Sequence, residues 1–182
     1  MTKDLIYIQL NTTPFYFESG GQVADTGKIY KIYPGGIGEV WDRSLNTFPN
    51  GLALNQDGDF LYVVMSLNSP RISRIPINSD GSPGQSETIV ELPKNVPDGL
   101  AFDNLGNLYI SCYRPDIVYV LSHDGKLDVL AEDFEGTLMA APTNLAFCGE
   151  NLRLLLGANL GRWHLTQYNV SSQGAPLNYP VL

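Results

Sequence analysis

The sequence predicts an all-β fold of about four repeated sheets, and three observations support this prediction. The 182 residues include 18 glycines, 12 prolines and 10 tyrosines, a composition typical of short strands separated by turns. The phrase FPNGLALNQDGDFLYV at residues 48–63 returns as VPDGLAFDNLGNLYIS at residues 96–111. Apolar and polar residues alternate within each copy, as they do in half-buried strands. The length suits one domain with its own core.

The repeat divides the chain into modules of similar size. Pro49 and Pro97, which open the two copies, are 48 residues apart, and a weaker third copy, APTNLAFCGENLRLLLG, has its Pro142 a further 45 residues on. A step of 47 residues back from Pro49 reaches TKDLIYIQL, which begins at Thr2. Four modules then fill the chain, at about residues 1–44, 45–95, 96–138 and 139–182.

Each module is predicted to hold four short antiparallel strands. In the third module, strands are expected at residues 99–103, 108–112, 117–122 and 127–132. The segments DNLGN and SHDGK between them carry the Asp, Asn and Gly of tight turns. A repeat of about 40 to 50 residues with four strands indicates the blade of a β-propeller, a sheet that buries its faces against neighbouring blades. We therefore expect a single partial propeller over residues 1–182, with its core between blades and no helix longer than about two turns.

Charge, cysteine spacing and the first residues argue against several kinds of partner, site and location. The formal net charge of −8 disfavours nucleic acid and anionic membrane surfaces, because both attract clustered Lys and Arg. Cys112 and Cys148 lack CxxC spacing, which predicts two free thiols rather than a disulfide framework or a zinc knuckle. The first residues show no export signal, and no apolar run approaches the roughly 18 residues of a membrane span. These features predict a cytoplasmic location.

Asn50 and Asp98 occupy the same place in successive copies, between the proline and Gly-Leu. Equivalent residues of a propeller are related by rotation about its axis, so side chains at this place can converge on one point. Carboxylate and amide oxygens suit calcium or magnesium, and zinc less specifically. Asn-Gly and Asp-Gly are also strong turn dipeptides, so a purely structural role in a turn is the alternative.

The repeated phrases resemble a known family. FPNGLAL with FLYVV, VPDGLAFDNLGNLYISCYRPDIVYVL, APTNLAF and the ending GAPLNYPVL are similar to the C-terminal two thirds of the regucalcin, gluconolactonase and senescence-marker-protein family of six-bladed propellers. The resemblance implies a divalent cation on the axis, held by a glutamate, two asparagines and an aspartate. Asn50 matches the second asparagine and Asp98 the aspartate.

The sequence differs from the family pattern in two respects. The place of the first asparagine falls at Lys3, whose ammonium group cannot ligate a cation. The resemblance also implies that about two N-terminal blades, with the glutamate ligand, are absent. An open arc of blades leaves apolar faces and sheet edges uncovered, which predicts self-association.

Further side chains are weaker candidates for the pocket or for other chemistry. Glu18, Thr143 and Asn144 could line a substrate pocket. A Ser-His-Asp triad is not favoured, because His123 falls in the turn SHDGK and His164 in the expected strand GRWHLTQY.

Two more motifs are interpreted as structural. NQDGD and SHDGK resemble calcium loops but lack the closing glutamate, so both are predicted to be hairpin turns. Trp41 and Trp163 are expected to pack between blades.

The hypothesis that follows is a metal-dependent, gluconolactonase-like hydrolase of small-molecule lactones, truncated or degenerate relative to the family. Calcium is the expected cofactor, with zinc and magnesium as alternatives. Asp98 would hold the metal and accept a proton from water, while Asn50 would supply a neutral oxygen. The alternative is a non-catalytic propeller fragment that serves as a binding or assembly module.

Overall fold

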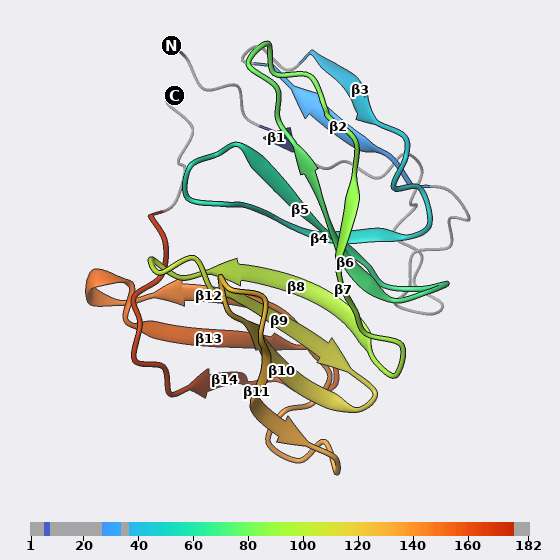
Figure 1. Cartoon of the computed structure of the whole chain (residues 1–182). Helices are drawn as coiled ribbons and strands as arrows, with labels where there is room; N and C mark the ends of the chain where they lie inside the picture. Colours follow the sequence, from blue (N-terminus) through green and yellow to red (C-terminus); the bar gives the residue numbers. More distant parts are fainter. Residues whose placement is uncertain (1–5, 8–26, 34–36, 177–182) are drawn as a thin grey trace.

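The computed structural model describes residues 6–7, 27–33 and 37–176, and every structural statement below concerns these residues. They form four antiparallel sheets, labelled in Figure 1. The only helical segment among them is the 3-10 turn η1 (Glu150–Leu152). No helix in this part of the chain is long and apolar enough to cross a membrane. The predicted all-β class is confirmed.

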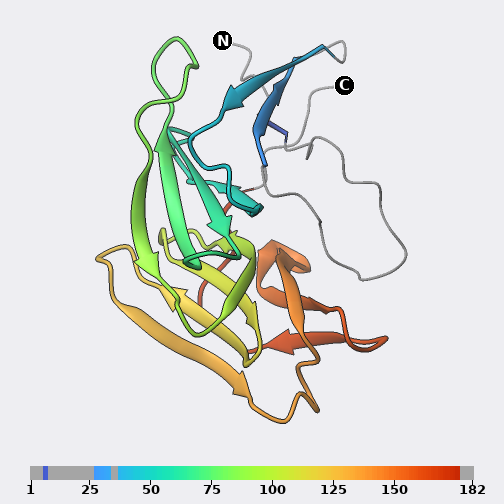
Figure 2. The same cartoon turned by 90° about the vertical axis from the view of Figure 1, so that its right-hand side faces the viewer.

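The strands follow one another through the sheets in chain order. The first sheet holds β1 (Ile6–Tyr7), β2 (Ile29–Ile32) and β3 (Gly38–Asp42). The second holds β4 (Pro49–Leu54), β5 (Phe60–Met65), β6 (Arg71–Pro76) and β7 (Glu87–Glu91). The third holds β8 (Val96–Phe102), β9 (Leu108–Tyr113), β10 (Asp116–Leu121) and β11 (Leu127–Asp133). The fourth holds β12 (Pro142–Cys148), β13 (Leu154–Asn159) and β14 (Leu165–Tyr168). Figure 2 shows the sheets arranged in an arc, like successive blades of a propeller.

The first sheet corrects the sequence frame for the start of the chain. A short connection joins β3 to β4, as others join β7 to β8 and β11 to β12, so β3 is an outermost strand. Counting inward through the order β1-β2-β3, β1 takes the place of the second strands β5 and β9. The repeat predicted that the segment beginning at Thr2 forms the innermost strand of the first module. Ile6–Tyr7 instead form the second strand of that sheet.

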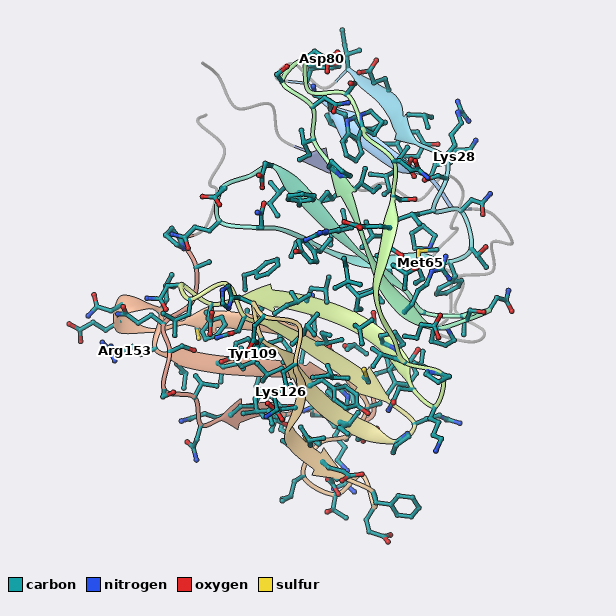
Figure 3. All side chains as sticks on the ribbon, in the orientation of Figure 1. Lys28, Met65, Asp80, Tyr109, Lys126 and Arg153 are labelled. Atoms are coloured by element: carbon teal, nitrogen blue, oxygen red, sulfur yellow. The ribbon has the colours of Figure 1, made fainter. Side chains whose placement is uncertain are left out.

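Apolar side chains fill the spaces between consecutive sheets, as predicted. One cluster joins Ile29 and Trp41 of the first sheet to Leu61 and Met65 of the second. A second cluster lies between the second and third sheets, around Val64, Ile72, Leu100, Phe102 and Ile110. The third joins β9 and β10 to the fourth sheet, where the Tyr109 and Phe147 rings meet edge to face, with centroids 5.2 Å apart. Tyr109, labelled in Figure 3, is buried between these two sheets.

Glycine allows the innermost strands of neighbouring sheets to touch. A Cβ added to Gly51 of β4 would lie 2.2 Å from the carbonyl oxygen of Asp98 in β8. A Cβ on Gly99 of β8 would lie 2.6 Å from the Cα of Asn144 in β12. Neither position has room for a side chain, so the Gly of the repeated phrase is needed for backbone contact between blades.

The segments that resemble calcium loops are hairpin turns, as predicted. In NQDGD, the Asn55 side-chain oxygen accepts hydrogen bonds from the backbone N–H groups of Asp59 (3.1 Å) and Phe60 (3.0 Å). Gly58 of NQDGD and Gly125 of SHDGK adopt left-handed conformations, with φ of 71° and 89°, which glycine tolerates best in tight turns.

Two expectations about single residues fail. Trp41 is 6% exposed and packs between sheets, as expected, but Trp163 is fully exposed in the β13–β14 turn. His164 also precedes β14 instead of lying within it, and its Nε2 is 2.8 Å from the carbonyl oxygen of Leu138. Alternation in GRWHLTQY suggested one strand, whereas the chain still bends at residues 161–163 and the strand begins only at Leu165.

Candidate functional site

Asn50 and Asp98 lie in β-bulges near the start of β4 and β8. The pairing register shifts between Pro49 and Leu52 on β4, and between Pro97 and Leu100 on β8. A bulge adds a residue to one strand and redirects its side chains. Because both residues belong to strands, the alternative that Asn-Gly and Asp-Gly serve as hairpin turns is wrong for these positions.

The two bulges bring Asn50 and Asp98 together. The Asn50 side chain lies close enough to the Asp98 carboxylate to influence that group as a polar neighbour. Asn50 Nδ2 donates to Ser66 Oγ at 3.2 Å, and Ser66 Oγ donates to the backbone carbonyl of Pro97 at 2.7 Å. A hydrogen-bonded chain therefore crosses from β4 to β8 where these strands begin. Met65, labelled in Figure 3, ends β5 beside this point and pairs with Pro49.

Asp98 is unusual for its electrostatic environment. Burial raises the pKa of its carboxyl group to about 6, against the smaller opposing effect of the polar Asn50 side chain. Burial, followed by the charge of Asp98, also raises the pKa of Cys112 and of Tyr113. A carboxylate that is only partly compensated by its neighbours favours a proton or a cation at this place.

Strained backbone gathers at this end of the sheets. Phe48 and Ala141, directly before the innermost strands β4 and β12, have φ of 54° and 55°. Asn68, Ser69 and Arg114, in the β5–β6 and β9–β10 connections, also have positive φ, between 52° and 76°. Left-handed residues other than glycine cost free energy and are concentrated at functional sites, so the end that holds Asp98 is the better candidate for function.

Thr143 and Asn144 lie beside the pair but are turned differently. In the repeat, Thr143 takes the place of Asp98 and Asn144 that of Gly99. The Thr143 hydroxyl faces its own sheet, 3.4 Å from the carbonyl oxygen of Ala158, while Asn144 Oδ1 accepts a hydrogen bond from the Leu145 N–H at 2.9 Å. The third copy of the phrase thus contributes a hydroxyl and an amide that already have local partners.

Lys3 and Glu18, which the sequence placed at or near the expected site, lie outside the described residues. Within the described ranges, no group of three or more His, Cys, Asp or Glu side chains is arranged to hold a metal ion. His123 lies in the turn between β10 and β11, and His164 lies directly before β14, where its Nε2 is 2.8 Å from the carbonyl oxygen of Leu138.

Ser66 and Tyr113 were missed by the sequence reasoning. Ser66 directly follows β5, and Tyr113 is the last residue of β9. Each comes one residue after the partner of the repeated proline, because Pro49 pairs with Met65 and Pro97 with Cys112. The signal that could have found them is this equivalent place in FLYVVMS and LYISCY.

Asn50 and Asp98 offer the types of oxygen atom that a hard cation binds. Asn50 donates an N–H group to Ser66, which leaves its carbonyl oxygen available as a neutral ligand. Asp98 adds a carboxylate. Oxygen donors of these two types suit calcium and magnesium, although two donors are fewer than either ion needs.

The chain belongs to a family described as SMP-30/gluconolactonase/LRE-like region, which matches residues 11–156. Gluconolactonases and regucalcin are also among the solved structures that it resembles. The resemblance inferred from the repeated phrases is thus confirmed.

Solved structures agree with the propeller fold. A gluconolactonase from Xanthomonas campestris is 23% identical, with a TM-score of 0.62 over 81% of this chain and 46% of that chain. A calcium-binding protein, regucalcin, from Agrobacterium tumefaciens strain C58 is 20% identical, with a TM-score of 0.65 over 86% of this chain and 56% of that chain. The chain spans about half the length of these proteins.

One curated protein matches over a short stretch. Alanine–tRNA ligase of Caldicellulosiruptor saccharolyticus is 47% identical over 53 residues, which are 29% of this chain and 6% of that protein. So small a share of the ligase carries no inference about function.

Proposed function

We propose that this chain carries part of a lactone-hydrolysing site in which Asn50 and Asp98 are ligands of a divalent cation. The observation behind the proposal is that equivalent bulges of two neighbouring blades present these side chains, and that Ser66 links Asn50 by hydrogen bonds to the residue before Asp98. Membership of a family that includes gluconolactonases supports the reaction class. The proposed substrate is a small lactone, such as a sugar lactone.

Asp98 has the properties of a proton acceptor near neutral pH. A carboxyl group with a pKa of about 6 is ionised at pH 7, yet binds a proton more strongly than an exposed aspartate does. In the proposed reaction Asp98 takes a proton from the attacking water, and Asn50 holds its amide oxygen toward the cation. When bound, such a cation would polarise the lactone carbonyl and lower the pKa of a water molecule. Thr143 and Asn144 remain candidates for contacts with the substrate.

Calcium is the first choice of cation, because carboxylate and amide oxygens are its usual ligands. Zinc and magnesium are the alternatives to compare. Calcium takes about six to eight oxygen ligands, so two protein donors predict weak binding and slow turnover.

The test is hydrolysis of a sugar lactone, followed as acid release, with calcium, zinc or magnesium present and again after chelation. We expect slow, cation-dependent hydrolysis by the chain and none above background in Asp98→Ala. Asp57→Asn, which removes an exposed carboxylate in the NQDGD turn, serves as the matched control and should keep the parent rate. Hydrolysis that survives Asp98→Ala would place the chemistry elsewhere.

A further inference from the structure

Ser66 connects the two blades that carry the proposed ligands. The residue directly follows β5 and is completely buried. Its Oγ accepts a hydrogen bond from Asn50 Nδ2 at 3.2 Å and donates one to the carbonyl oxygen of Pro97 at 2.7 Å. One hydroxyl group therefore holds a side chain of β4 and the backbone residue that precedes Asp98 on β8.

The direction of these bonds determines which way the Asn50 amide faces. A serine hydroxyl has one proton, and here it is donated to Pro97, so toward Asn50 the oxygen can act only as an acceptor. The group of Asn50 that faces Ser66 must then be the NH₂ group. If the amide were rotated by 180°, two acceptor oxygens would face each other in a buried place, which costs free energy.

The same arrangement leaves the amide oxygen of Asn50 available. One N–H of Asn50 bonds Ser66. With the nitrogen turned toward Ser66, the carbonyl oxygen is the atom of the amide that can face another group. A cation ligand needs this orientation, because an NH₂ group cannot ligate a cation.

We propose that Ser66 is a positioning residue, which fixes the amide of Asn50 with its oxygen toward the cation and ties this ligand to the strand that bears Asp98. The inference rests on the proposed cation site. It adds a residue that touches neither the cation nor the substrate and acts through Asn50.

Ser73 provides a matched control for loss of a buried hydroxyl. Ser73 belongs to β6 of the same sheet and is 1% exposed, and it pairs with Val63 in the middle of the strand. Ser73→Ala and Ser66→Ala thus remove the same atom from the same sheet, but only Ser66→Ala removes a bond to Asn50.

The first measurement concerns the cation-free protein and needs no activity. Solvent exchange of the Asn50 side-chain amide protons is measured by NMR, with the signals assigned from their loss in Asn50→Asp. We expect exchange in Ser66→Ala to be about fivefold faster or more, the factor that corresponds to loss of one neutral hydrogen bond. Ser73→Ala should exchange like the parent. An unchanged rate in Ser66→Ala, in a protein whose spectrum shows it folded, overturns the inference.

The second measurement is a calcium titration of the same variants by calorimetry. We expect the apparent dissociation constant to rise about fivefold in Ser66→Ala, to stay at the parent value in Ser73→Ala, and to return toward that value in Ser66→Thr, which keeps the hydroxyl. Binding that is lost in Asp98→Ala but unaffected in Ser66→Ala overturns the role of Ser66 and leaves the proposed function intact. Absence of calcium binding by the parent chain overturns both.

Discussion

Two aspartates of one blade illustrate how surroundings decide what a carboxylate can do. Asp103 is fully buried and accepts hydrogen bonds from two backbone N–H groups and from Asn107 Nδ2, so its charge stabilises the turn between β8 and β9. Asp98, five residues earlier, has the Asn50 side chain as a polar neighbour and a pKa raised by burial. Asp98 therefore lowers the stability of the fold at neutral pH, which is common for residues kept for function.

Removal of the Asp98 charge should stabilise the folded protein. The pKa of Asp98 is about 6 when folded and about 3.9 in an unfolded chain, so the folded state binds the proton more tightly. Stability is then highest below the unfolded pKa, falls as pH rises through this interval, and is constant above it. We expect Asp98→Asn to raise the free energy of unfolding by about 2 kcal/mol at pH 8, after allowance for partial solvent screening, and by almost nothing at pH 4.

Urea denaturation at the two pH values measures this difference. Asp57→Asn controls for net charge and should change stability little at either pH. Equal effects of Asp98→Asn at pH 8 and pH 4 would contradict the assigned cause.

Cation binding should weaken as pH falls through about 6. A protonated Asp98 cannot serve as an anionic ligand, so proton and cation compete for it. Well below its pKa of about 6, we expect the apparent affinity for calcium to fall about tenfold per pH unit, whereas above pH 7 it should be nearly constant. Calorimetric titrations from pH 5 to pH 8 measure the dependence, and an affinity that does not change across this range would exclude Asp98 as a ligand.

At the level of strands, backbone contact between blades shapes the site. Bulges at the start of β4, β8 and β12 occupy equivalent places, and glycine in the first two lets the next strand approach. Asn144 replaces glycine in the third bulge, where its side chain is exposed. The glycine is thus present where a neighbouring innermost strand packs closely.

Gly99→Ala should destabilise the protein for this reason. The new Cβ would meet the Cα of Asn144 at 2.6 Å and the carbonyl oxygen of Thr143 at 2.7 Å; because both are backbone atoms, the strands must move apart. We expect a loss of about 2 to 3 kcal/mol in the free energy of unfolding. Gly38→Ala, whose Cβ would have its nearest neighbours at 3.6 Å, should change the free energy by less than about 0.5 kcal/mol. Similar losses in the two variants would argue against the contact.

The sequence predicted the regular strands well and their irregularities poorly. Alternation and turn residues predicted β8 to β11 to within a few residues, because period-two patterns and Asp-Gly turns are local signals. The bulges were not foreseen, since they depend on contact between strands 48 residues apart. The first strand was assigned to the innermost place of its sheet, whereas it takes the second place. The reason is that TKDLIYIQL alternates like any strand of a blade, and alternation does not distinguish an innermost strand from its neighbour.

The described sheets form an arc (Figure 2), and no other described sheet covers one face of the fourth sheet. Ala53 and Ala101, at equivalent places on β4 and β8, are packed against apolar clusters next to the following sheets. Ala146 of β12, the next equivalent, is exposed, as are Ala158 and Leu165 on the adjoining strands. We propose that this face, defined by Ala146, Ala158 and Leu165, mediates self-association.

Leu165→Glu should weaken that association. A carboxylate placed in an apolar interface loses hydration without a partner, so we expect the dissociation constant of the associated form to rise about tenfold or more. Val129→Glu alters an apolar residue of β11 that is 54% exposed and serves as the control. Sedimentation over a range of concentrations measures both, and a monomeric parent chain would refute the proposal.

The proximity of Asn50 and Asp98 was predictable, but their hydrogen-bonded connections were not. The repeat predicted that the two side chains lie together, because equivalent residues of successive blades point to a common region. The hydrogen bonds through Ser66 could not be predicted, because Ser66 follows a different strand, β5, and only the pairing of Pro49 with Met65 brings it beside Asn50. Trp163 shows the opposite failure: its apolar character suggested burial, but the fold leaves it in an exposed turn.

The most direct test of a cation site between β4 and β8 is a calcium titration followed by NMR at pH 7.5. We predict that the backbone amide signals of Gly51 and Gly99, and the side-chain amide of Asn50, shift and saturate at calcium concentrations of roughly 0.1 to 1 mM or above, a range typical of weak calcium sites. The same signals should not move in Asp98→Ala. Shifts confined to other parts of the chain, or shifts near Gly51 and Gly99 that persist in Asp98→Ala, would contradict the assignment of Asn50 and Asp98 as ligands.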